Sequence, residues 1–346
     1  MNSRPLFPFR RGFAQRGVSL IELMIGMALG LIVVVGIGYI YMGSRQSYRV
    51  QDNMSRVQEN GRYAVDILGR DIRMAGFMGC ANLSVISLRT IADPSPNFSA
   101  GAALVGYDNG TGWTNPSSIT RVSGTDVVMI QKAASTGINV TEKMGVTNAN
   151  IKIGDNTLGF QAGQALFVTD CTAADLFRAT NISGGSGNVT IAHGNNSNSD
   201  PNMSCVKGGP SCDVNLSKTY GTDAEVLAFE SLTYFIGTNP AGRPALYRIP
   251  ITGTAVELVD NVESMQLTFG VDSDGNGTVN QYVAPSAVTD WAKVLTARVS
   301  LLMVSPEDSV TDAPQKYVYN GSTVTPADRR LRFIFTSTIG VRNRLL

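Results

Sequence analysis

The four cysteines are the most reactive side chains of the chain, and their spacing favours disulfides over a metal site. Cys80, Cys171, Cys205 and Cys212 include no C-x-x-C pair, and His193 is the only histidine that could join them as a ligand. Four cysteines allow three pairings. Cys205 and Cys212 flank a Gly-Gly-Pro turn, so we expect them to pair locally and to leave Cys80 with Cys171. Two disulfides would fit an oxidising compartment such as the periplasm.

A second candidate chemistry is cation binding by the stretch GVDSDGNGTVNQY. Asp272, Asp274 and Asn276 stand at alternate positions before a glycine, with Thr278 and Asn280 as further oxygen donors. The order resembles the first half of an EF-hand-type loop, which converges on calcium, although Val283 replaces the bidentate glutamate at position twelve. A polar hairpin turn is the alternative, because Asp-Gly and Asn-Gly are turn dipeptides. Calcium is thus the one candidate cofactor.

The sequence offers no constellation for enzymatic catalysis. His193 sits in IAHGNNSNSDP, which we interpret as a solvated loop tip rather than the position of a general base. No nucleophile elbow, phosphate-binding loop or recognisable pair of catalytic carboxylates occurs. The formal net charge is +1, so nothing in the composition favours a nucleic-acid partner. We therefore expect a protein that is not an enzyme.

A long apolar run near the start predicts a membrane-spanning helix. The run, 18–42, reads VSLIELMIGMALGLIVVVGIGYIYM, and its 25 residues exceed the ~20 that cross a bilayer. Arg10, Arg11 and Arg16 precede it, which predicts a cytoplasmic N-terminus and a periplasmic remainder. A cleaved secretory signal is the alternative, but no small-residue cleavage site follows Met42 and the helical pattern continues.

Glu22 is the one side chain within this run that is charged at neutral pH. An acidic side chain in a membrane span costs roughly 3 kcal/mol on insertion scales and by default needs a partner. Arg16 lies only six residues earlier, so the carboxylate could instead snorkel to the nearby interface. The residues alone leave both interpretations open.

Beyond the apolar run, the pattern predicts that the same helix continues as an amphipathic segment. Its apolar stripe recurs every three or four residues and consists of Val50, Met54, Val57, Gly61, Val65, Leu68 and Ile72. Gly76 is a candidate helix stop. We therefore expect one helix from Val18 to Ala75, roughly 87 Å long at 1.5 Å per residue.

After Cys80 the apolar period changes from that of a helix to that of a strand. We expect strands at Asp126–Gln131, Ala165–Thr169, Val189–Ala192, Glu225–Ile236, Ala245–Ile249, Val262–Val271, Val294–Val304 and Leu331–Val341. Two stretches, 92–120 and 181–221, are predicted as loops from their proline or Gly/Asn/Ser content. The expected fold class is α+β, with one antiparallel β-sheet body packed on the long helix.

The stretch RGVSLIELMIGMALG resembles the class III signal of type IV prepilins: a basic leader that ends in glycine, then an apolar helix with glutamate as its fifth residue. The resemblance implies that prepilin peptidase cuts between Gly17 and Val18. It also implies that Glu22 neutralises the N-terminal ammonium of a neighbouring subunit in the filament, where a buried carboxylate is tolerable once its partner arrives. The sequence departs from the family at Val18, where phenylalanine is usual.

Further stretches are similar to PilW-type minor pilins of the type IV pilus. They are RDIRMAGFMGC at the helix end, VDNVESMQLTFGVDSDGNGTVNQY, WAKVLTARVSLLMVS and the ending RRLRFIFTSTIGVRNRL. The resemblance implies a pilin-like subunit that joins other minor pilins in a tip complex, primes polymerisation of the major pilin and, in some systems, presents a large tip adhesin. It would act in pilus-dependent motility and adhesion.

The resemblance also implies an organisation and a location. Residues 1–17 would be the prepilin leader, 18–42 the transmembrane half of the helix, 43–76 its amphipathic half and 77–346 a periplasmic β-rich domain. The chain would cross the inner membrane once, with its N-terminus in the cytoplasm, and later reach the pilus tip.

Two other functions remain open. A J-type pseudopilin of a type II secretion system shares the same kind of anchor and often binds calcium, although such chains are usually shorter. A membrane-anchored periplasmic adhesin or binding domain is the other, because the loop-rich residues 90–220 match no pattern that would exclude it.

Overall fold

The computed structural model describes residues 17–80, 83, 86–145, 149–185, 187–199 and 216–344. The chain divides between Asp52 and Asn53 into two compact units. We call the described residues 17–52 the anchor and residues 53–344 the body, and consider each by itself. Cys205 and Cys212, with their predicted disulfide, lie outside the described residues, as does most of the predicted leader 1–17.

One long helix, α1 (Leu20–Arg73), supplies the whole anchor and the first element of the body. Its ends lie within two residues of the predicted Val18 and Ala75. Gly76 follows with a positive φ of 75° and donates its N–H to the Gln131 carbonyl at 2.9 Å. Glycine adopts this left-handed conformation without the steric cost of a Cβ, so the predicted helix stop is confirmed.

The body half of α1 is buried along one face. Val57, Gly61, Leu68 and Ile72 lie in that face as predicted. The buried stripe also contains Asn53, Ala64 and Gly69, whereas the predicted members Val50, Met54 and Val65 lie at its edges or in solvent. Small residues occupy the centre of the stripe, because the helix lies close against large side chains of the sheet.

The helix covers a four-stranded antiparallel sheet in the order β14-β13-β15-β18. These strands are β14 (Gln281–Val283), β13 (Val262–Val271), β15 (Val294–Val304) and β18 (Arg332–Gly340). Alternate apolar residues of β13 and β15 face α1 and form the largest core with Ala64, Leu68 and Ile72. The three long strands lie where the alternating pattern predicted them.

A nine-stranded sheet surrounds β10 (Glu225–Thr238), the longest strand. Its members are β1 (Leu88–Thr90), β2 (Leu104–Tyr107), β3 (Val127–Ala133), β4 (Ile138–Asn139), β6 (Ala165–Thr169), β7 (Ala174–Arg178), β11 (Pro244–Pro250) and β12 (Val256–Asp260). Residues 225–228 of β10 pair with β6, residues 229–234 with β3 and residues 232–238 with β11. β1 and β7 pair in parallel, so the body is not wholly antiparallel.

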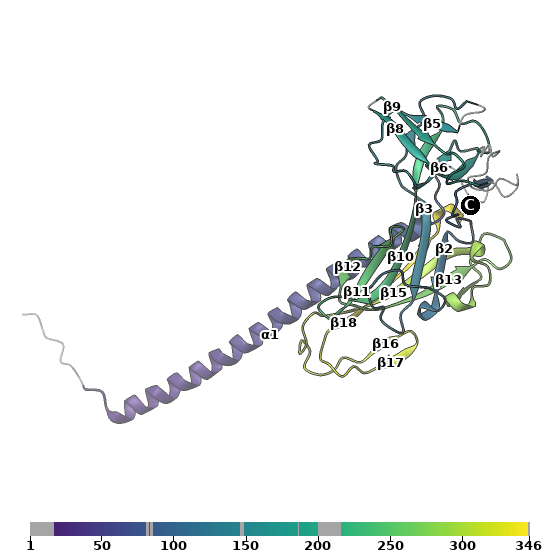
Figure 1. The fold of residues 1–346 in the computed structure, drawn as a ribbon. Coiled ribbons are helices and arrows are strands. Elements are labelled where there is room, and N and C mark those ends of the chain that lie inside the picture. The colour runs from purple at the N-terminus through teal and green to yellow at the C-terminus, as the bar shows by residue number, and fades with distance from the viewer. Residues whose placement is uncertain are drawn as a thin grey trace, which may run out of the picture. The chain divides into compact units, whose positions relative to one another are not determined.

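The start of β10, at Glu225 and Val226, belongs to a second lobe, which we define as the described residues of 138–226. A three-stranded sheet, β5 (Asn150–Ile153), β9 (Asn188–Ala192) and β8 (Asn181–Gly185), encloses its own core there, apart from the sheet that carries α1 (Figure 1). Strands therefore interrupt both stretches predicted as loops: β2 within 92–120, and β8 within 181–221. Short strands with polar composition carry too little alternation to be recognised.

The smallest sheet is the hairpin of β16 (Tyr317–Tyr319) and β17 (Ser322–Val324). Tyr319 Oη donates to the Ser300 carbonyl of β15 at 2.8 Å, which fixes the hairpin on the body. Short 3₁₀ turns complete the described elements, at Asp108–Gly110, Pro285–Ala287, Trp291–Lys293 and Arg342–Arg344.

Cys80 and Cys171 form a disulfide, as predicted, with their Cα atoms 5.0 Å apart. The bond joins the segment just after α1 to the second lobe across 91 residues of sequence. A cross-link that closes so long a loop removes much of the freedom of the unfolded chain.

Candidate functional site

The anchor exposes a long apolar surface. Every residue from Gly17 to Arg45 is exposed, and the apolar window of α1 is long enough to cross a membrane. Burying a large apolar side chain stabilises by about 1.5–3 kcal/mol, so such a surface is retained only where a bilayer or other helices cover it.

At the start of α1, Ser19 and Glu22 form a reciprocal capping box. Glu22 donates its N–H to Ser19 Oγ at 3.2 Å, and Glu22 Oε2 accepts the Ser19 N–H at 3.3 Å. Each side chain thus satisfies a main-chain donor that the first turn of a helix leaves unpaired. Gly17 and Val18 precede the helix in non-helical conformation and are exposed, so the predicted cleavage site between them is accessible. The Glu22 carboxylate lies beside Ser19, the residue that follows Val18.

The end of α1 is fixed to the body by a buried charge network. Lys132 Nζ lies 2.7 Å from Glu230 Oε2 and 3.6 Å from Asp71 Oδ1 on the helix. Tyr234 donates its hydroxyl to Asp71 Oδ2, and burial together with that carboxylate raises the pKa of Tyr234 far above 10. The lysine is almost fully buried, so removal of either acid would leave its charge poorly compensated.

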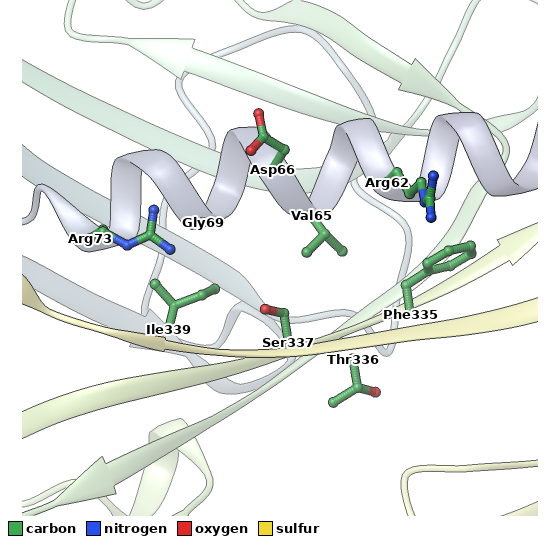
Figure 2. A pocket seen from close by; sticks show the side chains of 9 residues that line it. All are labelled: Arg62, Val65, Asp66, Gly69, Arg73, Phe335, Thr336, Ser337 and Ile339. Atoms are coloured by element: carbon green, nitrogen blue, oxygen red, sulfur yellow. The ribbon is translucent and has the colours of Figure 1, made fainter.

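Midway along the body half of α1, the helix lies directly against β18. A Cβ on Gly61 would stand 2.4 Å from the Phe335 ring, whereas one on Gly69 would stand 3.8 Å from Ile339. Phe335 and Ile339 point toward the helix, and Thr336 between them points away (Figure 2). Beside these contacts an open groove of about 310 Å³ runs between the two elements.

The first residue of β18 is held by two carboxylates. Arg332 is buried, and its guanidinium contacts Glu263 Oε2 at 2.6 Å and Asp328 Oδ1 at 2.6 Å. Hydrogen bonds from Arg332, against the opposing effect of burial, lower the pKa of Asp328 to about 2. The side chain of Gln315 pairs with the main chain of the same arginine, at 2.8 Å to its N–H and 3.0 Å to its carbonyl. The start of this strand is therefore rigid.

The five predicted calcium ligands lie together in the loop between β13 and β14. Asp272 accepts the N–H groups of Gly275 at 2.7 Å and Gly277 at 2.8 Å. Although burial acts in the opposite direction, these bonds hold the pKa of Asp272 below its usual value. Asp274 Oδ2 also accepts the side-chain N–H groups of Asn276 and Asn280, and Asn276 Oδ1 accepts the hydroxyl of Thr278.

This geometry is that of a closed polar turn, in which Asn276 accepts from Thr278 and Asn280 donates to Asp274. Across the residues that the structure describes, no three His, Cys, Asp or Glu side chains gather where they could hold a metal ion. The loop contributes only two carboxylates, and calcium binding there stays a prediction.

His193 does not lie at a solvated loop tip, contrary to our interpretation. Its side chain is 2 % exposed and packs edge-on against Phe177, with ring centroids 5.6 Å apart. The main-chain N–H of His193 donates to the Ala149 carbonyl at 2.9 Å, which places His193 beside β5 in the core of the second lobe. The polar residues that follow His193 suggested exposure, whereas the strand that precedes it carries the side chain inward.

Two families match parts of this chain. Residues 12–38 match the family described as the prokaryotic N-terminal methylation motif, and residues 233–343 match the family described as type IV pilus-assembly protein W. These two matches support a PilW-type protein of the type IV pilus. The first match covers Gly17, Val18 and Glu22; the second covers the four-stranded sheet, including β18.

No curated protein and no solved structure matches the chain. The prepilin-type motif and the exposed apolar helix fit a membrane-anchored pilin that reaches the pilus. The match to a pilus-assembly family indicates interaction with other pilus components.

Sequence reasoning missed two features of this PilW-type body. The charge network around Lys132 depends on residues that are far apart in sequence and carry no shared motif. The groove beside β18 arises because that strand ends its sheet, and the order of strands in a sheet cannot be derived from their alternation.

Proposed function

We propose that this minor pilin joins other minor pilins in a complex that initiates pilus assembly and then occupies the pilus tip. The major pilin would polymerise beneath this complex, and a large tip adhesin would be presented on it in systems that have one. The role would be assembly rather than catalysis, and it would contribute to pilus-dependent motility and adhesion.

The observation that carries the proposal is the position of the second lobe within the body. The anchor joins the body at Asn53, and the helix runs from there to Arg73. The second lobe begins at the far end of that helix, where Cys80 is bonded to Cys171. A bulky lobe at this end would obstruct a subunit stacked above it, but not subunits added below, which favours the first position in a filament.

The anchor supplies the other half of the argument. Before assembly, its apolar surface would lie in the inner membrane, with the N-terminus in the cytoplasm and the body in the periplasm. Prepilin peptidase would cut between Gly17 and Val18. Glu22 would then pair with the new ammonium group of a neighbouring subunit, since among the described residues its carboxylate is engaged only by the exposed Ser19.

The test combines N-terminal sequencing with complementation of a deletion strain. We expect a mature chain that begins at Val18 only when prepilin peptidase is present. We expect few surface pili in the deletion strain, and we expect the wild-type chain to restore them. Glu59→Ala, a control on the exposed face of the same helix, should also restore piliation, whereas Glu22→Ala should not.

Other outcomes would point elsewhere. Normal piliation with lost protein secretion would indicate the J-type pseudopilin. Normal piliation with lost surface attachment would indicate an adhesin or binding domain. A chain that still begins at Met1 in the presence of the peptidase would overturn the pilin function itself.

A further inference from the structure

β18 is the last strand of its sheet and leaves one edge open. It pairs with β15 along its whole length, and none of the described residues forms a strand on its other side. Hydrogen bonds at both ends fix which residues face outward: the Leu331 carbonyl and the Val341 N–H bond toward β15, whereas both main-chain groups of Arg332 bond to Gln315. Because the direction alternates along a strand, the main-chain groups of Ile334, Thr336 and Thr338 point away from β15.

These outward groups have no partner in the part of the chain that the structure describes. The side chains of the same residues lie on the solvent side of the sheet, and Ile334 is 39 % exposed. An unpaired edge of this kind is a template for another extended chain.

The sequence of β18 lacks the features that usually protect an edge. After Arg332 it reads FIFTSTIG, without a charge or a proline, and its pairing with β15 has no bulge. The edge strand β12, by contrast, carries Glu257 and Asp260 and is interrupted by a register shift against β11. Natural sheets place charges, prolines and bulges on edges that must not pair. β18 is therefore an edge that this body leaves available.

The groove between α1 and β18 adds a charge preference. Asp66 on its rim is paired with Arg70 at 3.1 Å. Arg62 and Arg73 also line the groove, are exposed and have no ion-pair partner among the described residues. The unbalanced charge along the groove is therefore positive, and it favours an acidic occupant (Figure 2).

We propose that the open edge of β18 binds an extended acidic segment of a different pilus subunit, which adds a strand to the sheet and faces Arg62 and Arg73. This inference rests on the proposed function for the identity of the partner. The helix advances about 16 Å from Arg62 to Arg73. Side chains on one face of a strand are an even number of positions apart, so two acidic residues about four or six positions apart would meet both arginines.

A second copy of this chain is a poorer occupant for two reasons. Its own β18 would bring two more unpaired arginines into the same interface. The helix also runs in the same direction as β18, because Gly61 lies at Phe335 and Gly69 at Ile339. If the β18 strands of two copies paired in antiparallel fashion, the two anchors would leave the pair at opposite ends. Two subunits anchored in one membrane cannot adopt this arrangement.

The experiment compares amide exchange in the full chain, purified alone and in complex after co-production with the other prepilins of its source organism. The N–H groups of Ile334, Thr336 and Thr338 should exchange at least tenfold more slowly in the complex. Recovery of the partner should fall at least tenfold with Thr336→Pro, which removes an outward donor but no bond to β15, and should be unchanged with Thr336→Ala. Arg62→Glu should weaken it, whereas Lys143→Glu, an exposed charge reversal in the second lobe, should not.

The outcomes separate this inference from the proposed function. A complex that forms with unprotected β18 amides and tolerates Thr336→Pro would overturn the edge as the docking site and leave the minor-pilin function intact. Protection in the chain alone at high concentration would identify a second copy as occupant and overturn the acidic partner. If no prepilin binds the chain, both proposals fail. Exchange in the wild-type chain requires no variant to fold.

Discussion

Gly61 and Gly69 offer a matched test of how α1 lies against β18. Both glycines face the same strand from the buried face of the same helix, two turns apart, and neither has a positive φ. Alanine at either position would gain about 0.5–1 kcal/mol, because glycine is a poorer helix former. The two sites differ only in what the new methyl group would meet.

At Gly69 the added Cβ would lie 3.8 Å from Ile339, an ordinary van der Waals contact. Gly69→Ala should therefore raise the free energy of unfolding by up to about 1 kcal/mol. At Gly61 the Cβ would lie 2.4–2.6 Å from three atoms of the Phe335 ring, which must move. Displacing a packed side chain typically costs 1–3 kcal/mol, so Gly61→Ala should lower stability by about 1 kcal/mol net.

Urea unfolding of the full chain in detergent, followed by the fluorescence of Trp113 and Trp291, measures both changes. Combining Gly61→Ala with Phe335→Ala should remove the clash, so in that background the same alanine should become stabilising. If Gly61→Ala proved as stable as Gly69→Ala, or if Phe335→Ala left its effect unchanged, the close approach of helix and strand would be refuted.

Three further predictions concern covalent, ionic and metal interactions. Replacing Cys80 and Cys171 by serine should lower the free energy of unfolding, by about 4.6 kcal/mol if chain entropy alone acts on a 91-residue loop, as measured by urea unfolding under oxidising conditions. The pKa of Asp328 is about 2 in the folded chain, so its pair with Arg332 should contribute its full stabilisation above about pH 4. About 1–2 kcal/mol of the free energy of unfolding should be lost as the pH falls toward 2. Asp328→Asn should flatten that part of the pH–stability curve, and an unchanged curve would contradict the pairing. If the loop after β13 binds calcium with a Kd of ~0.1–1 mM, 10 mM calcium should stabilise the chain by roughly 1.4–2.7 kcal/mol. EGTA should reverse the gain and Asp274→Ala should abolish it, whereas equal melting with calcium and EGTA would exclude the site.

The parts of the fold that could be predicted are those whose pattern is local. β13, β15 and β6 alternate apolar and polar residues or are fully apolar, and their bounds agree with the expected ones. The helix was recognisable because one apolar run continues into a 3.6-residue period and ends at Gly76. Glu22 stood out because a charge in an apolar run is rare.

What could not be predicted depends on contacts between distant residues. The polarity around His193 indicated a surface loop, but the burial of this ring is decided by Phe177, on a neighbouring strand. The short strands β2 and β8 form because β3 and β9 offer them partners, not because of their own composition. The open edge of β18 likewise follows from the order of strands in the sheet.

The disulfide between Cys80 and Cys171 also determines how the body would carry a mechanical load. A filament that is pulled transmits tension through α1 into the segment that follows it. With the bond intact, tension applied between α1 and any residue after Cys171 passes directly through the sulfur atoms. The chain between the two cysteines, which are 91 positions apart in sequence, is bypassed, and roughly 300 Å of chain at ~3.4 Å per residue cannot be drawn out. The disulfide thus limits how far the chain can be extended by force at the junction of the helix and the second lobe.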